Sequence, residues 1–445
     1  MPLFSPTVSR LALLPVAAAA LAVSCGASAA TLEVIPPDPD YGADSYLGVS
    51  SNASVVVGYG VNNVYYLDAA RNANAISANT PYNGYSGSPS VSASGRYIAA
   101  GVTGSDGYSQ AGIYDTSTHS WTALGGLGNG VYSTGYMTVQ SSYASGISAN
   151  GSTVVGAAGY SATPNSEASS QHAAVWRNGQ VYDLNGGSTN TNGRIVATSG
   201  NGSMVAGYTN NNDPSSYRVW SWNGSGYSQT AAPTVVNPFD GTTGAAKVTA
   251  LSANGVWGAG DSSDFTASQN YGGFFNGIVF QQATLWNSQT NSTTVIPFDH
   301  LIDFTDVNAM YYDIDKNMRA SIAGVLDDGT VFGTFDTCAS NTCGAFGPTY
   351  DTWVYSTSTG KSITFDSYLA QHGITLSATQ HVSHIDGVSA DGSAVTGLIF
   401  DTDSFTTSSF IVSNISAVPE PGQWALMALG LPLLMLRRMR NHRAN

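Results

Sequence analysis

The stretch GISANGSTVVG, residues 146 to 156, decides the fold because the chain returns to it, for example as GVSADGSAVTG at residues 387 to 397. The shared pattern is a small or apolar residue, Ser, two further residues, Gly, and an apolar run that ends in Gly. Successive serines are separated by 42, 56, 51, 53, 74 and 63 residues, with Leu326 in place of the serine in the sixth copy. The seven copies of this repeat motif cover residues 49–58, 91–101, 147–156, 198–207, 251–260, 325–333 and 388–397.

Each copy of the repeat motif predicts the tip of a β-hairpin. Asn-Gly or Asp-Gly dipeptides accept the two positive φ angles of a type I′ turn, and apolar residues typical of strands flank them. The first copy has Asn52-Ala53 and the second Ser94-Gly95, so those turns can differ in type. The five dipeptides are Asn150-Gly151, Asn201-Gly202, Asn254-Gly255, Asp328-Gly329 and Asp391-Gly392.

A second hairpin follows most copies, as in AAVWRNGQVYDLNG (173–186) and TWVYSTSTGKSITFD (352–366). Two hairpins per repeat make a four-stranded meander, which is the unit of a β-propeller blade. A pair of sandwiches or a β-solenoid are the competing all-β folds. The repeat is too long for one solenoid coil, and seven copies suit a closed ring better than sandwiches. The sequence therefore predicts an all-β, seven-bladed β-propeller over residues 31–417.

The last repeat predicts how the ring closes. It supplies strands near 385–389, 394–399 and 408–416, and then lacks a fourth. The stretch TLEVIPPD (31–38) stands ahead of the first repeat without a hairpin partner and resembles TTVIPFD (293–299), the expected outer strand of the fifth unit. An open ring would expose two sheet edges. We therefore expect Leu32 to Ile35 to form the outer strand of the seventh blade, beside Phe410 to Val412.

Residues 1 to 30 have the layout of a secretory signal peptide. Arg10 precedes an apolar run from Leu11 to Val23, and GASAAT offers a small-residue cleavage site at Ala27 to Ala29. Cys25 would leave with this segment. Its context, LAVSC, alternatively allows a lipoprotein site, although the usual Leu three residues ahead of the cysteine is missing.

The other end, residues 418–445, combines a Pro-Glu-Pro tripeptide, a short apolar run from Trp424 to Leu436 and an arginine cluster. Thirteen apolar residues are short against the roughly 20 of a stable spanning helix, which favours a transient signal over a plain C-terminal membrane helix. The three elements together resemble the PEP-CTERM sorting signal of Gram-negative bacteria. That resemblance implies an exosortase partner, cleavage near the tripeptide, transient inner-membrane insertion and an exopolysaccharide-producing host. The residues that carry it are Pro419, Glu420, Pro421, Arg437, Arg438 and Arg440.

The repeats resemble the HAF-type extracellular repeats often found in PEP-CTERM proteins. In that family a G-I-S/N-x-x-G-x-V-V-G hairpin is followed by an A-x-x-W strand. Here the usual His-Ala-Phe triplet is replaced by variants such as His172-Ala173-Ala174. The resemblance therefore rests on the first hairpin of each repeat.

Charge and cysteine content fit an extracellular protein. Residues 31 to 421 keep all 28 acidic residues but only nine of the 14 Lys and Arg, a net charge of −19, which repels nucleic acid and anionic lipid. Cys338 and Cys343 enclose four residues, and without a second cysteine pair they lack the ligands of a zinc site. In an oxidising compartment they most simply form a local disulfide that holds a loop.

Two stretches invite a metal hypothesis. In HVSHID, His381 and His384 stand three residues apart with Asp386 nearby, but strand residues at that spacing point to opposite faces. A long connection gathers carboxylates that could bind Ca²⁺, although it lacks the D-x-[DN]-x-[DN]-G order of a calcium loop. We therefore expect neither a metal nor a cofactor, with calcium as a minor alternative. The carboxylates are Asp299, Asp303, Asp306, Asp313 and Asp315.

Two classes of function follow. The first is a non-catalytic, exported surface or matrix protein that binds polysaccharide or another surface protein. The second is a secreted propeller enzyme, a lyase or glycosidase acting on polysaccharide. The chain contains no G-x-S-x-G, H-E-x-x-H or P-loop motif and is poor in Lys, Arg, Glu and His. Because an enzyme should gather such groups around the axis, the sequence favours binding over catalysis and predicts no catalytic residue.

Overall fold

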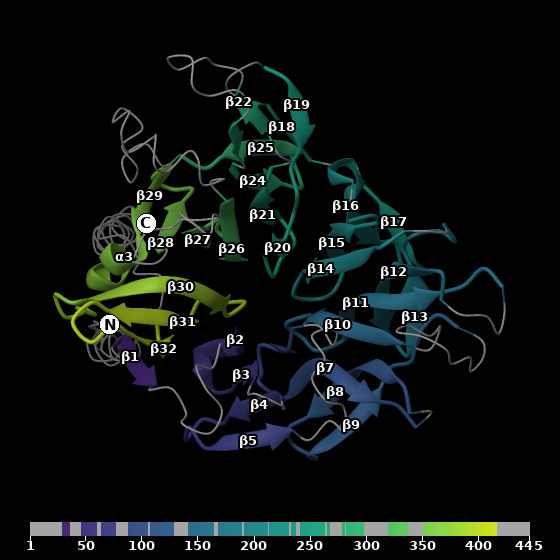
Figure 1. The fold of residues 1–445 in the computed structure, drawn as a ribbon, viewed down its shortest axis with the longest axis horizontal. Helices are drawn as coiled ribbons and strands as arrows, with labels where there is room; N and C mark the ends of the chain where they lie inside the picture. The colour runs from purple at the N-terminus through teal and green to yellow at the C-terminus, as the bar shows by residue number, and fades with distance from the viewer. Residues whose placement is uncertain are drawn as a thin grey trace, which may run out of the picture.

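Seven four-stranded antiparallel sheets stand around a central axis in the computed structural model of the chain (Figure 1). Each repeat forms one blade, so the predicted seven-bladed β-propeller is confirmed. The structure describes residues 29–35, 46–59, 64–76, 88–105, 107–128, 141–163, 168–188, 191–211, 213–230, 233–236, 241–262, 265–267, 278–280, 282–297, 319–336 and 350–415.

The strands of each blade are numbered outward from the axis. Blade 1 holds β2 (Tyr46–Val49), β3 (Val56–Tyr59), β4 (Val64–Leu67) and β5 (Ala73–Ile76); blade 2 holds β6 (Ser90–Val91), β7 (Tyr97–Thr103), β8 (Ser109–Asp115) and β9 (Ser120–Ala123). Blade 3 holds β10 (Ser142–Ile147), β11 (Thr153–Tyr160), β12 (Ser170–Arg177) and β13 (Gln180–Asp183); blade 4 holds β14 (Arg194–Thr198), β15 (Met204–Tyr208), β16 (Tyr217–Trp222) and β17 (Tyr227–Gln229).

The remaining blades follow the same order. Blade 5 holds β20 (Ala250–Leu251), β21 (Trp257–Asp261), β24 (Ala283–Asn287) and β25 (Ser292–Val295); blade 6 holds β26 (Arg319–Val325), β27 (Val331–Asp336), β28 (Tyr350–Ser356) and β29 (Lys361–Thr364). Blade 7 holds β30 (Gln380–Val388), β31 (Ala394–Asp401), β32 (Thr406–Ser413) and β1 (Thr31–Ile35).

The second strand of each blade explains why the repeat motif ends in an apolar run. Because neighbouring strand residues point to opposite faces, a strand between two neighbouring blades must be apolar at consecutive positions. On β11, Val154 packs in a cluster with Ala99 of blade 2, whereas Val155 packs in another with Val205 of blade 4. The blades therefore stack through continuous apolar contacts on both faces.

The tryptophans of the third strands fill the space toward the preceding blade. Trp176 of blade 3 packs in the cluster that contains Ala99 and Ala111 of blade 2, and Trp286 of blade 5 packs with Ala206 of blade 4. Small residues on one blade thus accommodate a large ring from the next. This interlocking gives a physical reason for the A-x-x-W pattern.

The ring closes as the sequence predicts. β1 pairs antiparallel with β32, with Leu32 opposite Val412 and Val34 opposite Phe410. The closing strand also contacts blade 1, because the Arg71 Nε donates to Glu33 Oε2 at 2.7 Å. The N-terminal strand therefore joins the last blade to the first without a covalent bond.

The predicted type I′ turns are wrong for the Asn-Gly and Asp-Gly copies. In the third copy the Gly151 N–H donates to the Ser148 carbonyl, and Gly151 alone of the dipeptide has a positive φ, 75°. The turn is thus centred one residue earlier. The reason is Ser148, whose buried hydroxyl accepts the Thr153 N–H at 3.0 Å. The first copy does differ, since Asn52 and Ala53 both have positive φ.

The motif turns lie at the same end of the channel and bind one another around the axis. The Ala93 N–H of blade 2 donates to the Ala149 carbonyl of blade 3, and the Gly200 N–H of blade 4 donates to the Ala253 carbonyl of blade 5. The same kind of bond links blade 3 to blade 4 and blade 1 to blade 2. Hydrogen bonds between turns therefore supplement apolar packing between blades.

Several elements were not expected from the sequence. The ribbon β18 (Thr234–Val236) and β19 (Thr243–Ala245) lies between blades 4 and 5, and β22 (Phe265–Ala267) with β23 (Ile278–Phe280) is inserted into blade 5. The helix α3 (Phe365–Gln371) connects blades 6 and 7, and single turns occur at η1 (Ser51–Ala53) and η2 (Pro214–Ser216). None of the helices in the described ranges has the length and apolar character needed to span a bilayer.

Candidate ligand site in the central channel

A β-bulge at one position of the inner strands shapes the channel. In the strand pairings of blades 1, 3, 4, 6 and 7 the register shifts at the residue three positions before the motif serine, or before Leu326 in blade 6. A bulge re-aims a side chain, and four of these five residues line the channel. The bulged residues are Leu47, Ser145, Val196, Ala323 and Asp386.

The bulge also explains the glycine that ends the repeat motif. A Cβ atom on Gly156 would overlap the Tyr143 carbonyl oxygen, which the bulged strand presses against the second strand. The same carbonyl position meets the motif-ending glycine in four further blades, at Gly207, Gly260, Gly333 and Gly397. The glycine therefore permits the bulge that points a side chain at the axis.

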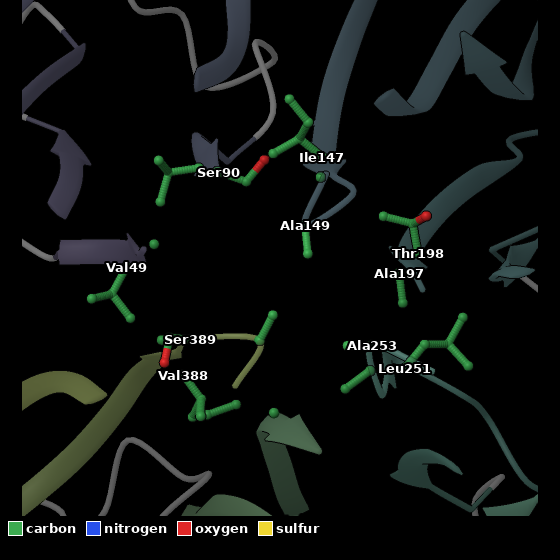
Figure 2. A pocket seen from close by; sticks show the side chains of 18 of the residues that line it. Val49, Ser90, Ile147, Ala149, Ala197, Thr198, Leu251, Ala253, Val388 and Ser389 are labelled. Carbon is green, nitrogen blue, oxygen red and sulfur yellow. The ribbon is translucent and has the colours of Figure 1, made fainter. Parts of the chain in front are cut away.

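The channel encloses about 230 Å³ and takes its walls from the inner strands of all seven blades (Figure 2). Its walls are small or apolar. Apolar wall residues include Val49, Ile147, Ala149, Ala197, Leu251, Ala253 and Val388. Among the described residues that line it, Asp386 is the one with a titratable side chain.

Asp386 is a buried carboxyl without full hydrogen bonding. Its side chain is 7% exposed, and its Oδ1 lies 3.5 Å from Nε2 of His384. Its Oδ2 has no hydrogen-bond partner among the described residues. Burial raises the pKa of Asp386 to about 7, because an apolar wall solvates a carboxylate poorly.

A Ser–His–Asp arrangement in blade 3 was missed by sequence reasoning. Ser170 Oγ lies 3.2 Å from His172 Nε2, and His172 Nδ1 lies 2.9 Å from both Asp183 carboxylate oxygens. However, Nε2 also lies 2.6 Å from the Ser188 carbonyl oxygen, and a nitrogen that donates there cannot accept the serine proton. The fully buried ring is stacked on Tyr160. We assign His172 to the core and not to a nucleophilic site.

A row of half-buried aromatic and charged side chains crosses blades 3 to 5 where the inner strands begin. The Arg194 guanidinium lies 5.3 Å from the Tyr143 ring centroid, and the Lys247 ammonium lies 5.5 Å from that of Tyr217. Tyr208 sits between the two, opposite both Arg194 and Tyr217 in the sheet. We call Tyr143, Arg194, Tyr208, Tyr217, Lys247 and Asp261 the blade 3–5 row.

The contacts within the row keep its members in place. Arg194 Nε donates to Ser145 Oγ at 2.6 Å, and Lys247 Nζ donates to Asp261 Oδ2 at 2.8 Å. The rings of Tyr208 and Tyr217 lie 5.2 Å apart. Burial raises the pKa of Tyr217 to about 12, so its hydroxyl stays protonated at neutral pH.

The stretch HVSHID separates into different environments. His381 packs edge-on against Phe400, with ring centroids 5.4 Å apart, whereas His384 lies beside Asp386. A second bulge between Val382 and His384 alters the strand alternation on which the sequence argument relied. Across the described ranges, no three His, Cys, Asp or Glu side chains form a group that could hold a metal ion.

Other predicted sites lie outside the described residues. They include the signal peptide, the sorting tail and the possible disulfide, as well as the acidic connection. The residues concerned are Cys338, Cys343, Asp299, Asp303, Asp306, Asp313, Asp315, Pro419, Glu420, Pro421, Arg437, Arg438 and Arg440. These assignments stay predictions.

Comparison with solved structures finds β-propellers at low sequence identity. The β-propeller domain of the Trilobed protease from Pyrococcus furiosus is 9% identical with a TM-score of 0.41, covering 86% of this chain and 100% of that one. An oligogalacturonate lyase in complex with manganese is 10% identical with a TM-score of 0.43, covering 88% and 97%. A prolyl endopeptidase is 11% identical with a TM-score of 0.42, covering 84% and 47%. No protein-family model and no characterised protein sequence matches the chain.

Proposed function

We propose that this chain is an exported β-propeller of the cell surface or extracellular matrix that binds polysaccharide and does not act as a catalyst. The observation that carries the proposal is the blade 3–5 row. Tyrosine rings with fixed polar neighbours can stack on the apolar faces of sugar rings while the neighbours bind hydroxyls. A row across three blades suits an extended chain better than a compact ligand.

The charge distribution supports this surface. Of the nine Lys and Arg between residues 31 and 421, Arg194 and Lys247 both belong to the row, in a segment whose net charge is −19. Each cation also contacts a tyrosine ring. The row therefore offers hydrogen-bond donors on a protein that is otherwise rich in acceptors.

Affinity electrophoresis in gels containing exopolysaccharide from the host tests the proposal. We expect the purified protein to be retarded and Tyr208→Ala to lose most of the retardation. The matched control is Tyr97→Ala, which removes another half-buried tyrosine beside an arginine, Arg96, but next to the motif turn of blade 2. Equal loss in both variants, or no retardation of the parent, would contradict binding at the row.

Export and sorting form the second part of the proposal. Residues 1–30 would direct secretion, and residues 418–445 would be recognised by an exosortase through Pro419-Glu420-Pro421, as their resemblance to a PEP-CTERM signal implies. Intact-mass analysis of protein recovered from the cell surface should show a C-terminus near Pro421. A full-length C-terminus at Asn445 would rule out this processing.

A secreted enzyme that acts on polysaccharide is the second candidate. The specific observation in its favour is the His384–Asp386 pair, because a base beside a buried acid at a channel can support proton transfer. Incubation with polysaccharide, followed by assays for new reducing ends and for unsaturated products, separates the two candidates. Products that disappear in Asp386→Asn would favour the enzyme, whereas retardation without products would favour binding.

A further inference from the structure

The repeat makes Asp386 stand out. Each blade has a residue three positions before its motif serine, or before Leu326 in blade 6, and five of the seven are bulged toward the axis. Six of the seven are uncharged. In chain order they are Leu47, Pro89, Ser145, Val196, Thr249, Ala323 and Asp386. A carboxyl at this level therefore departs from what the architecture requires.

Nothing in the fold around Asp386 compensates a negative charge except His384 on its own strand. The neighbouring inner strand β26 presents Ala323 and Val325 to the channel, and β2 presents Leu47 and Val49, all of them uncharged. Oδ2 has no partner among the described residues, although the side chain is 93% buried. An unpaired buried carboxylate is costly, and a bound cation would offset that cost.

A second polar atom on the wall also lacks a partner within the described part of the chain. Ser90 Oγ of blade 2 is buried and lines the same channel as Asp386. A carboxylate and a hydroxyl are both acceptors, which an ammonium group with three donors can use. The rest of the wall would contact only the apolar part of a ligand.

We propose that the central channel binds a small organic ammonium compound, with its cationic head at Asp386 and its aliphatic part along the apolar wall. The volume of about 230 Å³ accommodates a short alkyl chain with its head group. A divalent metal fits less well, because one carboxylate and one imidazole fall short of the three or four protein ligands such ions take. The site is separate from the blade 3–5 row, so its test does not depend on polysaccharide binding.

The test compares n-butylammonium with n-butanol, which has the same stem but no charge. Ligand-observed NMR titration of the mature protein at pH 8.5 should give binding of n-butylammonium at least about tenfold tighter than that of n-butanol. The raised pKa of Asp386 implies that this preference falls at pH 5.5, where the carboxyl is protonated. Equal binding of the two ligands at pH 8.5 would overturn the proposal.

Three variants locate the site. Asp386→Asn should abolish the preference for the ammonium, whereas Asp403→Asn, which removes an exposed carboxylate of the same blade, should keep it. Ala323→Leu narrows the channel at a position where blade 1 already carries Leu47, and it should weaken both ligands. A preference that survives in folded Asp386→Asn, or that is lost in Asp403→Asn, would assign the binding to general surface charge and refute the channel site.

Discussion

Gly156 lies so close to Tyr143 that a Cβ atom on the glycine would overlap the tyrosine's carbonyl oxygen. Backbone atoms of a bulged strand cannot move aside without breaking the ladder that holds β10 to β11. We expect Gly156→Ala to lower the free energy of unfolding by about 2 kcal/mol, as overpacking in a core does. Urea denaturation measures this, and Gly226→Ala, where an added Cβ meets open space, should change stability by less than about 0.5 kcal/mol.

The motif serine stabilises its turn from inside the protein. Ser148 is fully buried, and its hydroxyl accepts the Thr153 N–H and donates to Asn150 Oδ1. Ser148→Ala should cost about 1–3 kcal/mol, since it leaves a buried N–H without its acceptor. Ser152→Ala removes an exposed hydroxyl from the same turn and should stay within about 0.5 kcal/mol. Equal urea midpoints for the two variants would refute the role of Ser148.

The closing strand should control the stability of the ring as a whole. Leu32 packs against the apolar cluster of blade 7, and Glu33 binds Arg71 of blade 1. Deletion of residues 31–36 should lower the thermal midpoint by many degrees, because it exposes the edge of β32. Glu33→Gln removes only the ion pair and should have a small effect. A deletion variant that melts like the parent would show that the clasp is dispensable.

Asp386 should make stability depend on pH. Its pKa rises from 3.8 to about 7 on folding, so the folded state holds a proton that the unfolded state releases. Stability is therefore greatest below pH 4 with respect to this group and declines as pH rises through 7. Asp386→Asn should be more stable than the parent at pH 8, by on the order of 4 kcal/mol, and equal to it near pH 4. Parallel unfolding curves over this range would contradict the burial of the carboxyl.

Ser170 should not be a reactive nucleophile despite its histidine and aspartate neighbours. The Ser188 carbonyl occupies the His172 nitrogen that would have to accept the serine proton. A fluorophosphonate probe should leave Ser170 unlabelled, as peptide mass spectrometry can check, while His172→Ala should destabilise the fold by about 2–4 kcal/mol through loss of packing and hydrogen bonds. Labelling that disappears in Ser170→Ala would assign a catalytic role to the arrangement.

The sequence by itself determined the blades, their number and their closure. Turn residues between apolar runs recur seven times, and local hairpins require only neighbouring residues to agree. The closing strand followed from counting: the seventh repeat lacked one strand, and Leu32 to Ile35 had no other partner. These features depend on short-range pattern and strand number, which a linear chain displays directly.

Only the tertiary structure decided what faces the axis. Asp386 is buried because seven inner strands converge there and a bulge turns it inward, and neither cause lies in the residues next to it. The turn type followed from burial of Ser148, which the dipeptide Asn150-Gly151 does not reveal. His172 and Asp183 met through the pairing of β12 with β13. Register, bulges and the distance to the axis are set by pairing and packing between blades, so no local stretch of the sequence contains them.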